Sequence, residues 1–463
     1  MTDQISMNAF VMNCVGHQCS GLWRHPRDRS EDYRTLPYWT DLAKTLERGL
    51  FDGIFIADVL GAYDVYGKSP EAALRSGMQV PINDPLMLIP AMASVTEHLG
   101  FGVTCSLTYE GPYTFARRMS TLDHLTNGRI AWNIVTSFLD SAARASGLAK
   151  QHDHDLRYDI AEEYMSIVYK LWEHSWEDGA VVRDRKAGIF TDPSKVHRLR
   201  HAGKHYTLDA IHLCEPSPQR TPVLYQAGTS PRGSAFAARH AECVFVNGPS
   251  SEVIAHYVKL MREEIAKQGR DPASVHIISM LTVIAGETDA EAQRKFMDYS
   301  EYATREGAFV VLSGWSGVDY ATLSLSDSVK HMRTDSMQTG VDRFSKADPN
   351  KVWSVAEMAD FTSIGGAGPV IIGSPSKIVD ELQHRKEVTG VDGFNLAYTV
   401  MPETYVDFVD LIVPEMQRRG VYKTAYAPGT LREKLFGGGP RLGASHAASK
   451  AGPLFGPAYS AAE

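Results

Sequence analysis

The chain has 463 residues, of which 43% are hydrophobic, 22% charged and 10% aromatic, a composition typical of a globular protein and not of a disordered or collagen-like one. Its formal net charge of −8 and the lack of a basic run argue against nucleic acid or an anionic membrane as the main partner. The sequence shows neither a signal peptide nor an apolar run near the ~20 residues of a membrane helix, and its five scattered cysteines predict free thiols in the cytoplasm.

In the first half of the chain, short apolar runs rich in β-branched residues alternate with longer amphipathic stretches. The apolar runs predict buried strands, at Ile5–Met12, Gly53–Ala57, Gly102–Leu107 and Ile130–Thr136. The amphipathic stretches have helical periodicity, and they predict helices at Tyr38–Leu50, Leu86–Leu99, Tyr113–Leu125 and Ile160–Trp172.

The same alternation resumes after residue 220. Strands are predicted at Val223–Gln226, Cys243–Val246, His276–Ala285 and Phe394–Thr399, with a further extended run at Pro369–Ile372. Helices are predicted at Ser230–Arg239, Glu252–Gln268, Asp289–Tyr299, Ser376–Val388 and Tyr405–Arg418.

Strict alternation of strands and helices indicates parallel strands joined by helical crossovers, an α/β fold. About eight such strands suffice to close a (β/α)8 TIM barrel, and we expect one barrel domain over residues 1–436. An open doubly wound sheet is the alternative, but no Gly-x-Gly-x-x-Gly turn follows the first strand.

Three segments interrupt or follow the alternation. Long insertions near residues 174–220 and 301–367 are expected to cover the carboxyl ends of the strands, where barrels bind their ligands. The Gly- and Ala-rich segment 437–463 is expected to be a flexible or partner-bound tail.

Polar and reactive side chains follow the first two strands. Cys14 and His17 come just after the first strand, and Asp58 ends the second. A thiol and an imidazole at a strand tip could serve catalysis, and Asp58 could anchor a polar ring edge or a sugar hydroxyl of a cofactor. Equally, Cys14 could be a buried apolar side chain and Asp58 a helix cap. Downstream, Tyr63 and Gln79 could cover a pocket.

A second group of candidates follows the fourth and fifth strands. The fourth strand ends in the small hydroxyls of Thr136 and Ser137 and the ring of Phe138. The hydroxyls could lie beside a phosphate or a flavin ring, or they could simply form the polar end of the strand. The fifth strand runs into Ala227-Gly228-Thr229-Ser230 and then a helix, so exposed N–H groups and two hydroxyls could bind a phosphate. Simple capping of the helix by Ser230 is the alternative.

The residues His152, Asp153, His154 and Asp155 could suggest a metal site. This cluster precedes a helix, however, where acidic residues are expected from the helix dipole alone. We therefore expect no metal site.

Several co-linear stretches together resemble the bacterial luciferase-like superfamily of flavin-dependent monooxygenases. They extend to about Phe436 and include Gly21-Leu22-Trp23-Arg24-His25-Pro26, Asn83-Asp84-Pro85, Arg157-Tyr158-Asp159, Gln226-Ala227-Gly228 and Asp392-Gly393-Phe394-Asn395. The resemblance is greatest to the branch that contains the long-chain alkane, dimethyl sulfide and nitrilotriacetate monooxygenases.

This resemblance implies a TIM barrel that takes reduced FMN from a separate NADH-dependent reductase, uses O2 as co-substrate and forms a homo-oligomer. The flavin-contacting positions of the family correspond to Asp58, Ser137, Phe138, Tyr158, Ala227, Gly228, Thr229 and Ser230. Pocket positions of the alkane enzymes correspond to Cys14, His17, Tyr63 and Gln79.

Two pocket histidines expected from the alkane enzymes are Phe138 and Val311 here. Without these imidazoles the pocket is drier and less basic, which favours a small, weakly polar substrate such as a dialkyl sulfide over a long-chain alkane. A flavin- or deazaflavin-dependent dehydrogenase and a non-catalytic flavin-binding subunit remain as alternatives on the same barrel.

Overall fold

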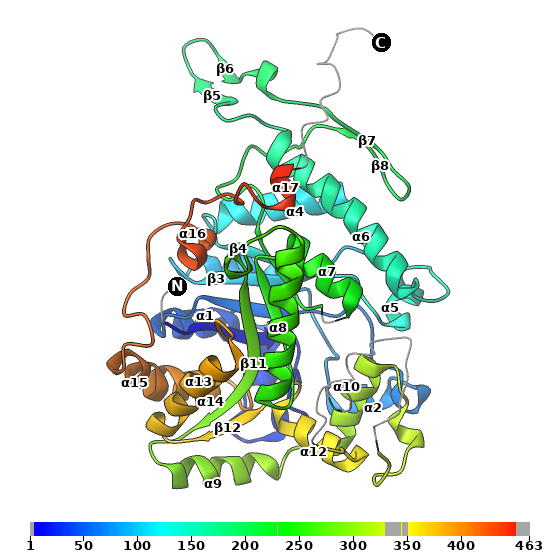
Figure 1. Cartoon of the computed structure of the whole chain (residues 1–463), viewed down its shortest axis with the longest axis vertical. Helices are drawn as coiled ribbons and strands as arrows, with labels where there is room; N and C mark the ends of the chain where they lie inside the picture. The colour runs from blue at the N-terminus through cyan, green and yellow to red at the C-terminus, as the bar shows by residue number, and fades with distance from the viewer. Residues whose placement is uncertain (1–3, 229, 329–343, 345–350, 451–463) are drawn as a thin grey trace.

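The computed structural model describes residues 4–228, 230–328, 344 and 351–450, and within them eight parallel strands close into a barrel (Figure 1). The barrel strands are β1 (Ser6–Met12), β2 (Gly53–Ala57), β3 (Gly100–Ser106), β4 (Ile130–Val135), β9 (Val223–Gln226), β10 (Cys243–Val246), β11 (His276–Ala285) and β13 (Gly393–Ala397). Strand β1 pairs with both β2 and β13, and β10 pairs with β11, so the ring is complete. The predicted TIM barrel is confirmed.

The predicted extended run near residue 370 forms a ninth strand outside the ring. Strand β12 (Val370–Gly373) pairs in parallel with the last four residues of β11, Thr282–Ala285. Because β11 is ten residues long, its first part can pair with β10 while its last part carries β12.

Helices surround the barrel and bury their apolar faces against its outer surface. They are α1 (Leu36–Arg48), α4 (Pro112–Leu125), α6 (His154–Tyr169), α7 (Pro231–His240), α8 (Ser251–Lys267), α9 (Asp289–Ser300), α13 (Pro375–Thr389), α14 (Glu403–Asp407) and α15 (Val413–Arg418). Single π-helical turns extend α6 over Lys170–His174 and join α14 to α15 over Phe408–Ile412. Each of these helices lies close to its predicted range.

The helix predicted at Leu86–Leu99 is wrong in length. The structure has a 3-10 turn at Pro85–Leu88 and the short helix α3 (Ile89–Ala93). The backbone beyond α3 is held by other partners. Glu47 accepts N–H groups from residues 97 to 99, and the buried Arg129 guanidinium donates to the carbonyls of residues 93, 96 and 99. These hydrogen bonds replace the helical ones.

The amino end of the barrel is plugged by the short helix α16 (Leu431–Phe436). Leu431 belongs to the apolar cluster inside the barrel, which also contains the rings of Phe55, Tyr225 and Phe245. The buried Arg432 guanidinium makes an ion pair with Glu242, at 2.7 Å between Nε and Oε1. This packing fills the amino end of the barrel interior.

The first insertion does not lie where it was predicted. Its hairpins, β5 (Val181–Asp184) with β6 (Ile189–Thr191) and β7 (Leu199–Ala202) with β8 (Thr207–Ala210), project away from the barrel beside α4 and α6 (Figure 1). The insertion packs on the carboxyl-terminal half of α4, where His212 Nε2 lies 2.9 Å from Ser120 Oγ and Gln219 Nε2 donates to Asp123 at 2.7 Å. Because the segment follows a helix, the chain has already returned to the amino ends of the strands.

The second insertion lies at the carboxyl end of the barrel, as predicted. Its helices α10 (Arg305–Ser316) and α12 (Val355–Gly365) pack together, and α10 also contacts α2 (Glu71–Ser76), so that the three form one group in Figure 1. The small helix α5 (Asp140–Ala145) adds Ala142 to the same apolar surroundings.

The segment after residue 436, which was expected to be a flexible or partner-bound tail, is folded against the barrel up to residue 450. His446 is buried and its Nε2 lies 2.8 Å from the carbonyl oxygen of His240. Ala448, in α17 (Ala447–Lys450), joins the outer core. The barrel domain therefore extends to about residue 450, and residues 451–463 lie outside the described part. Among the described residues, no helix is long and apolar enough to cross a membrane.

Candidate functional site at the carboxyl end of the barrel

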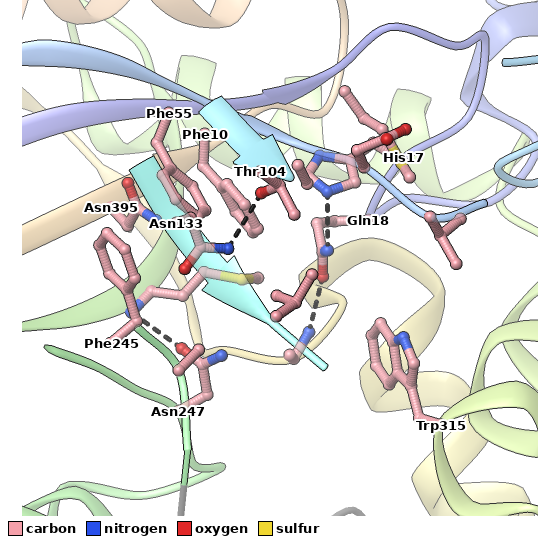
Figure 2. Close-up of a pocket in the computed structure, with 18 of the residues that line it drawn as sticks. Phe10, His17, Gln18, Phe55, Thr104, Asn133, Phe245, Asn247, Trp315 and Asn395 are labelled. Atoms are coloured by element: carbon pink, nitrogen blue, oxygen red, sulfur yellow. Dashed lines mark hydrogen bonds between the residues drawn. The ribbon is translucent and has the colours of Figure 1, made fainter. Parts of the chain in front are cut away.

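A cavity of about 270 Å³ opens at the carboxyl ends of the barrel strands (Figure 2). Successive side chains of a strand point to opposite faces, so every second residue of each strand points into the barrel. These inward positions give the cavity a mixed apolar and amide floor, which includes Phe10, Phe55, Thr104, Asn133, Phe245 and Asn395.

The amides of the floor have unused hydrogen-bonding capacity. Asn133 Nδ2 donates to Thr104 Oγ1 at 3.0 Å, but the Oδ1 atoms of Asn133 and Asn395 are buried and have no hydrogen-bond partner among the residues that the structure describes. Leaving such an acceptor unpaired costs roughly 1–3 kcal/mol. A flat ligand with N–H groups along one edge, such as a flavin ring, fits these acceptors between the aromatic side chains.

His17 lies at the side of this cavity with its ring against Phe10, at 4.5 Å between centroids. Its Nε2 lies 3.1 Å from Nε2 of Gln18, and Gln18 Oε1 accepts a hydrogen bond from the N–H of Ala367 at 3.2 Å (Figure 2). Burial lowers the pKa of His17 to about 3, so the imidazole is neutral.

The other two candidates from this region, Gln79 and Cys14, contact the backbone at His17 and at Gly16. Gln79 lines the cavity, has a left-handed backbone (φ 54°) and donates from Nε2 to the carbonyl oxygen of His17 at 2.9 Å. Cys14 does not line the cavity. Its thiol donates to the carbonyl oxygen of Gly16 at 3.2 Å. Burial raises the pKa of this thiol, and the charge of Asp58 raises it further. Cys14 is therefore a protonated thiol outside the cavity lining.

The ring of Tyr63 forms an apolar part of the cavity wall, and helix α10 packs very closely against this ring. The ring is 3% exposed. A Cβ built on Gly314 would overlap its Cδ1 and Cε1 and lie 3.0 Å from Cγ. The next residue, Trp315, lines the cavity. Tyr63 and Val311 belong to one apolar cluster, against which Phe138 packs.

Asp58 is the carboxyl group of the cavity wall. Burial raises its pKa to about 7, with a further contribution from Asp84 and an opposing one from the N–H of Val59. Asp58 and Gln79 also line an adjoining cavity of about 360 Å³, so the two spaces share a wall. A carboxyl group with such a pKa changes its charge near neutral pH.

The turn after β9 combines a close backbone approach with a helix start. A Cβ on Gly228 would lie 2.9 Å from the backbone carbon of Gly233, so only glycine fits there. Ser230 caps α7 by accepting the N–H of Gly233 at 3.0 Å. Tyr158 is buried, and its hydrogen bonds to Ser230 and Gln226 oppose the rise in pKa that burial causes.

Ser137, at the end of β4, has a left-handed backbone (φ 54°), which is unusual for a residue other than glycine. Its Oγ lies 2.7 Å from Ser106 Oγ, and its carbonyl oxygen accepts a hydrogen bond from Arg157. These contacts hold a strained turn that directs the next residue, Phe138, into the cavity.

The structure brings most of the predicted residues together. Six line the cavity, namely His17, Asp58, Tyr63, Gln79, Phe138 and Ala227. Tyr158, Gly228 and Ser230 form the adjacent turn site, Ser137 and Cys14 lie behind the wall, and Thr229 lies outside the described residues.

Sequence reasoning missed Gln18, Asn133, Asn395 and Trp315. The two asparagines carried a usable signal, because each is a polar residue at an inward position of a buried strand. Trp315 comes from an insertion whose path the sequence did not reveal.

The cluster at residues 152–155 has a local role. His154 Nδ1 lies 2.9 Å from Asp155 Oδ1 and its Nε2 lies 3.2 Å from Ser230 Oγ. Within the ranges that the structure describes, no group of three or more His, Cys, Asp or Glu residues is arranged to hold a metal ion.

Comparisons with known proteins match this site. The family described as luciferase-like monooxygenase matches residues 20–393. Dimethyl-sulfide monooxygenase of Hyphomicrobium sulfonivorans is 50% identical over 94% of this chain and 91% of its own, and its crystal structure superposes with a TM-score of 0.90. Long-chain alkane monooxygenase of Geobacillus thermodenitrificans (strain NG80-2) is 49% identical over 97% of this chain and 98% of its own. Riboflavin lyase, solved with modified FMN and riboflavin, superposes with a TM-score of 0.91 at 34% identity. The match covers 97% of this chain and 99% of the lyase chain.

The family match covers most of the chain, and two relatives near 50% identity cover almost all of it. The barrel is therefore that of an enzyme, and the chain belongs to the luciferase-like, reduced-flavin-dependent monooxygenase family.

Proposed function

We propose that the chain is the oxygenase of a two-component system. It takes reduced FMN from a separate NADH-dependent flavin reductase and inserts one oxygen atom of O2 into a small dialkyl sulfide such as dimethyl sulfide. Bound reduced flavin supplies the activation of O2. The protein binds the flavin, excludes water and controls protons around it.

The turn after β9 suits the phosphate of FMN. The N–H groups at the start of α7 and the hydroxyl of Ser230 face the same turn, and Tyr158 adds a second hydroxyl beside it. A helix start favours an anion through its dipole and its free N–H groups. Ala227 connects this turn to the cavity, where the unpaired Oδ1 atoms of Asn133 and Asn395 can accept from the ring edge.

The apolar wall is the observation that carries the substrate proposal. Tyr63 and Val311, with Phe138 against them, present carbon to the region beside the cavity, and His17 and Cys14 are uncharged. A sulfide sulfur attacks an electrophilic oxygen with its own lone pair and needs no protein base. A dry wall also protects the activated oxygen from water.

Terminal hydroxylation of long-chain alkanes is the second candidate, because the alkane relative is as similar as the sulfide relative. A cavity of about 270 Å³ that must also admit the flavin edge favours the smaller substrate. Membership in a monooxygenase family argues against the dehydrogenase and the non-catalytic subunit.

The experiment combines the protein with FMN, a flavin reductase, NADH and O2, and compares product formation from dimethyl sulfide and from hexadecane. We expect turnover of the sulfide and little of the alkane. Preference for hexadecane would reverse the order of the two candidates, and no turnover of either would refute both.

Flavin binding is tested by anaerobic titration with FMNH2. Ser230→Ala removes a helix cap and a phosphate contact, and we expect both a loss of about 1 kcal/mol of stability and a clear drop in affinity. Ser250→Ala is the matched control, because Ser250 caps α8 by accepting the N–H of Val253 at 3.4 Å. It should cost similar stability and leave affinity unchanged. Equal affinities in the two variants would contradict the phosphate site.

The same proposal includes a cytoplasmic location and a homo-oligomer. All five cysteines are free thiols, which suits a reducing compartment that supplies NADH. The β5–β6 hairpin exposes Val182, Ile189 and Phe190, and burial against a second copy would remove these side chains from water. Light scattering of the protein and of Phe190→Ser tests this: a monomer in both cases would refute it.

A further inference from the structure

We propose that Gln18, held by the backbone N–H of Ala367, is a positioning residue that fixes the proton of His17 on Nδ1. The proposal rests on the proposed function for its role in oxygen transfer. Its geometry stands on the three groups joined in Figure 2, the N–H of Ala367, the amide of Gln18 and the ring of His17.

The orientation of the Gln18 amide follows from its first partner. The N–H of Ala367 can only donate, so the group of Gln18 that faces it at 3.2 Å must be the oxygen. The NH2 group then faces His17, at 3.1 Å from Nε2. An amide NH2 can only donate, so His17 Nε2 must be the unprotonated acceptor, and the proton of the neutral ring lies on Nδ1.

Further hydrogen bonds between the segments on either side of Gln18 and Ala367 hold the two residues together. Residues 18 to 20 run beside residues 363 to 367: the N–H of Ser20 donates to the carbonyl of Ser363 at 3.1 Å, and the thiol of Cys19 donates to the carbonyl of Ile364. Gln18 is 5% exposed. Gly366 has φ +59°, and a Cβ there would overlap Gln18 Oε1 and lie 2.7 Å from Gln18 Cβ. The amide therefore has little freedom to turn.

Among the titratable side chains of Tyr398, Tyr63, Cys14 and Asp58 around His17, that of Asp58 is the one that can carry a charge near neutral pH. Phe10 lies against the ring, and Tyr398 from the end of β13 lies 6.3 Å away between centroids. Burial raises the pKa of Tyr398, Tyr63 and Cys14, so all three stay protonated. Asp58 is the carboxyl group among the residues that line the cavity, with a pKa of about 7.

This arrangement has a consequence for proton control. While the end of the second insertion contacts Gln18, the lone pair of His17 Nε2 is occupied and the ring cannot accept a proton there. His17 is thus held as a neutral ring that carries its proton on Nδ1.

Two substitutions of Gln18 test how its hydrogen bonds to Ala367 and His17 set the protonation of the ring. Gln18→Glu keeps an acceptor for Ala367 but offers an ionised carboxylate to His17, which favours a proton on Nε2 and a charged ring. Gln18→Met keeps the shape and removes both hydrogen bonds. Gln79→Met is the matched control, because Gln79 donates to the backbone carbonyl of His17 and not to its ring.

The measurement is ¹⁵N NMR of histidine-labelled, flavin-free protein between pH 5 and 9, with the His17 signals assigned from their loss in His17→Asn. We expect the neutral Nδ1–H tautomer throughout in the parent protein and in Gln79→Met. In Gln18→Glu we expect the His17 pKa to rise by at least two units and Nε2 to carry a proton, and in Gln18→Met a mixture of tautomers.

An Nε2–H tautomer in the parent protein, or the same tautomer in the parent, Gln18→Glu and Gln18→Met, would overturn the proposal. The experiment uses neither flavin nor substrate, so its outcome is separate from that of the proposed function. The pH profile of turnover in Gln18→Glu adds a functional measurement: we expect a new ionisation that the parent protein lacks, and an unchanged profile would refute the link to catalysis.

Discussion

Replacement of Gly314 by alanine tests the wall that α10 builds against Tyr63. In an ordinary helix this change stabilises by up to about 1 kcal/mol. Here the new Cβ would overlap two ring carbons of Tyr63 and lie 3.0 Å from a third. Overpacking of this kind typically costs about 1–3 kcal/mol, and the ring is buried, so either Tyr63 or the whole of α10 must move.

The expected consequence is a displacement of about 1 Å or more at the cavity wall, which in an active site can lower the rate by roughly 100-fold. The assay measures kcat and KM for the sulfide with saturating FMNH2. Gly111→Ala is the matched control, because φ there is −69° and no atom of the described residues lies within 4 Å of its Cβ position. We expect this control to retain full activity.

A double mutant isolates the cause of the loss. In the Tyr63→Ala background the ring is gone, so adding Gly314→Ala should change the remaining activity by less than about twofold. If Gly314→Ala alone keeps parental activity, or if its effect is equally large without the ring, the placement of Tyr63 as a wall of the functional cavity is wrong.

Two further predictions concern charge. Arg432→Met leaves Glu242 buried without its partner, and we expect a loss of about 3–5 kcal/mol in urea unfolding, most of which Arg432→Met/Glu242→Gln restores; a double mutant as unstable as the single one would argue against this ion pair. The folded-state pKa of Asp58, about 7, exceeds the value of about 3.9 for an unfolded aspartate, so this carboxyl lowers the stability of the fold progressively as the pH rises from about 4 to about 7, and by a constant amount above that. Asp58→Asn should therefore raise the Tm of the flavin-free protein more at pH 8 than at pH 5, and an equal change at both pH values would contradict the pKa shift.

The barrel was predictable because its strands have strong local patterns. Each of the eight is a short apolar run bounded by breakers, and the long crossovers between them require parallel pairing. The position of β12 outside the ring was not predictable, since it depends on the length of β11 and on which neighbours reach its second half. The first insertion was misplaced because its length alone suggested a lid. Its position after a helix, which brings the chain back to the amino ends of the strands, was the better guide.

The site likewise contains residues that could be predicted from the sequence and residues that could not. Residues at strand tips, such as His17 and Asp58, could be nominated from sequence because strand tips of a barrel meet at one rim. Gln18 could not, because its role depends on a backbone N–H almost 350 positions away, at Ala367. The contact of Gly314 with Tyr63 is equally invisible, since it arises from how an insertion packs across the rim.

The most direct test of the whole account is a single-turnover experiment. The protein is loaded anaerobically with FMNH2, mixed with ¹⁸O2 and dimethyl sulfide, and the product is examined by mass spectrometry. The account predicts one ¹⁸O atom in the oxygenated product and a yield that falls sharply in Ser230→Ala but not in Ser250→Ala. Absence of label from the product, or a failure of the parent protein to bind FMNH2, would contradict it.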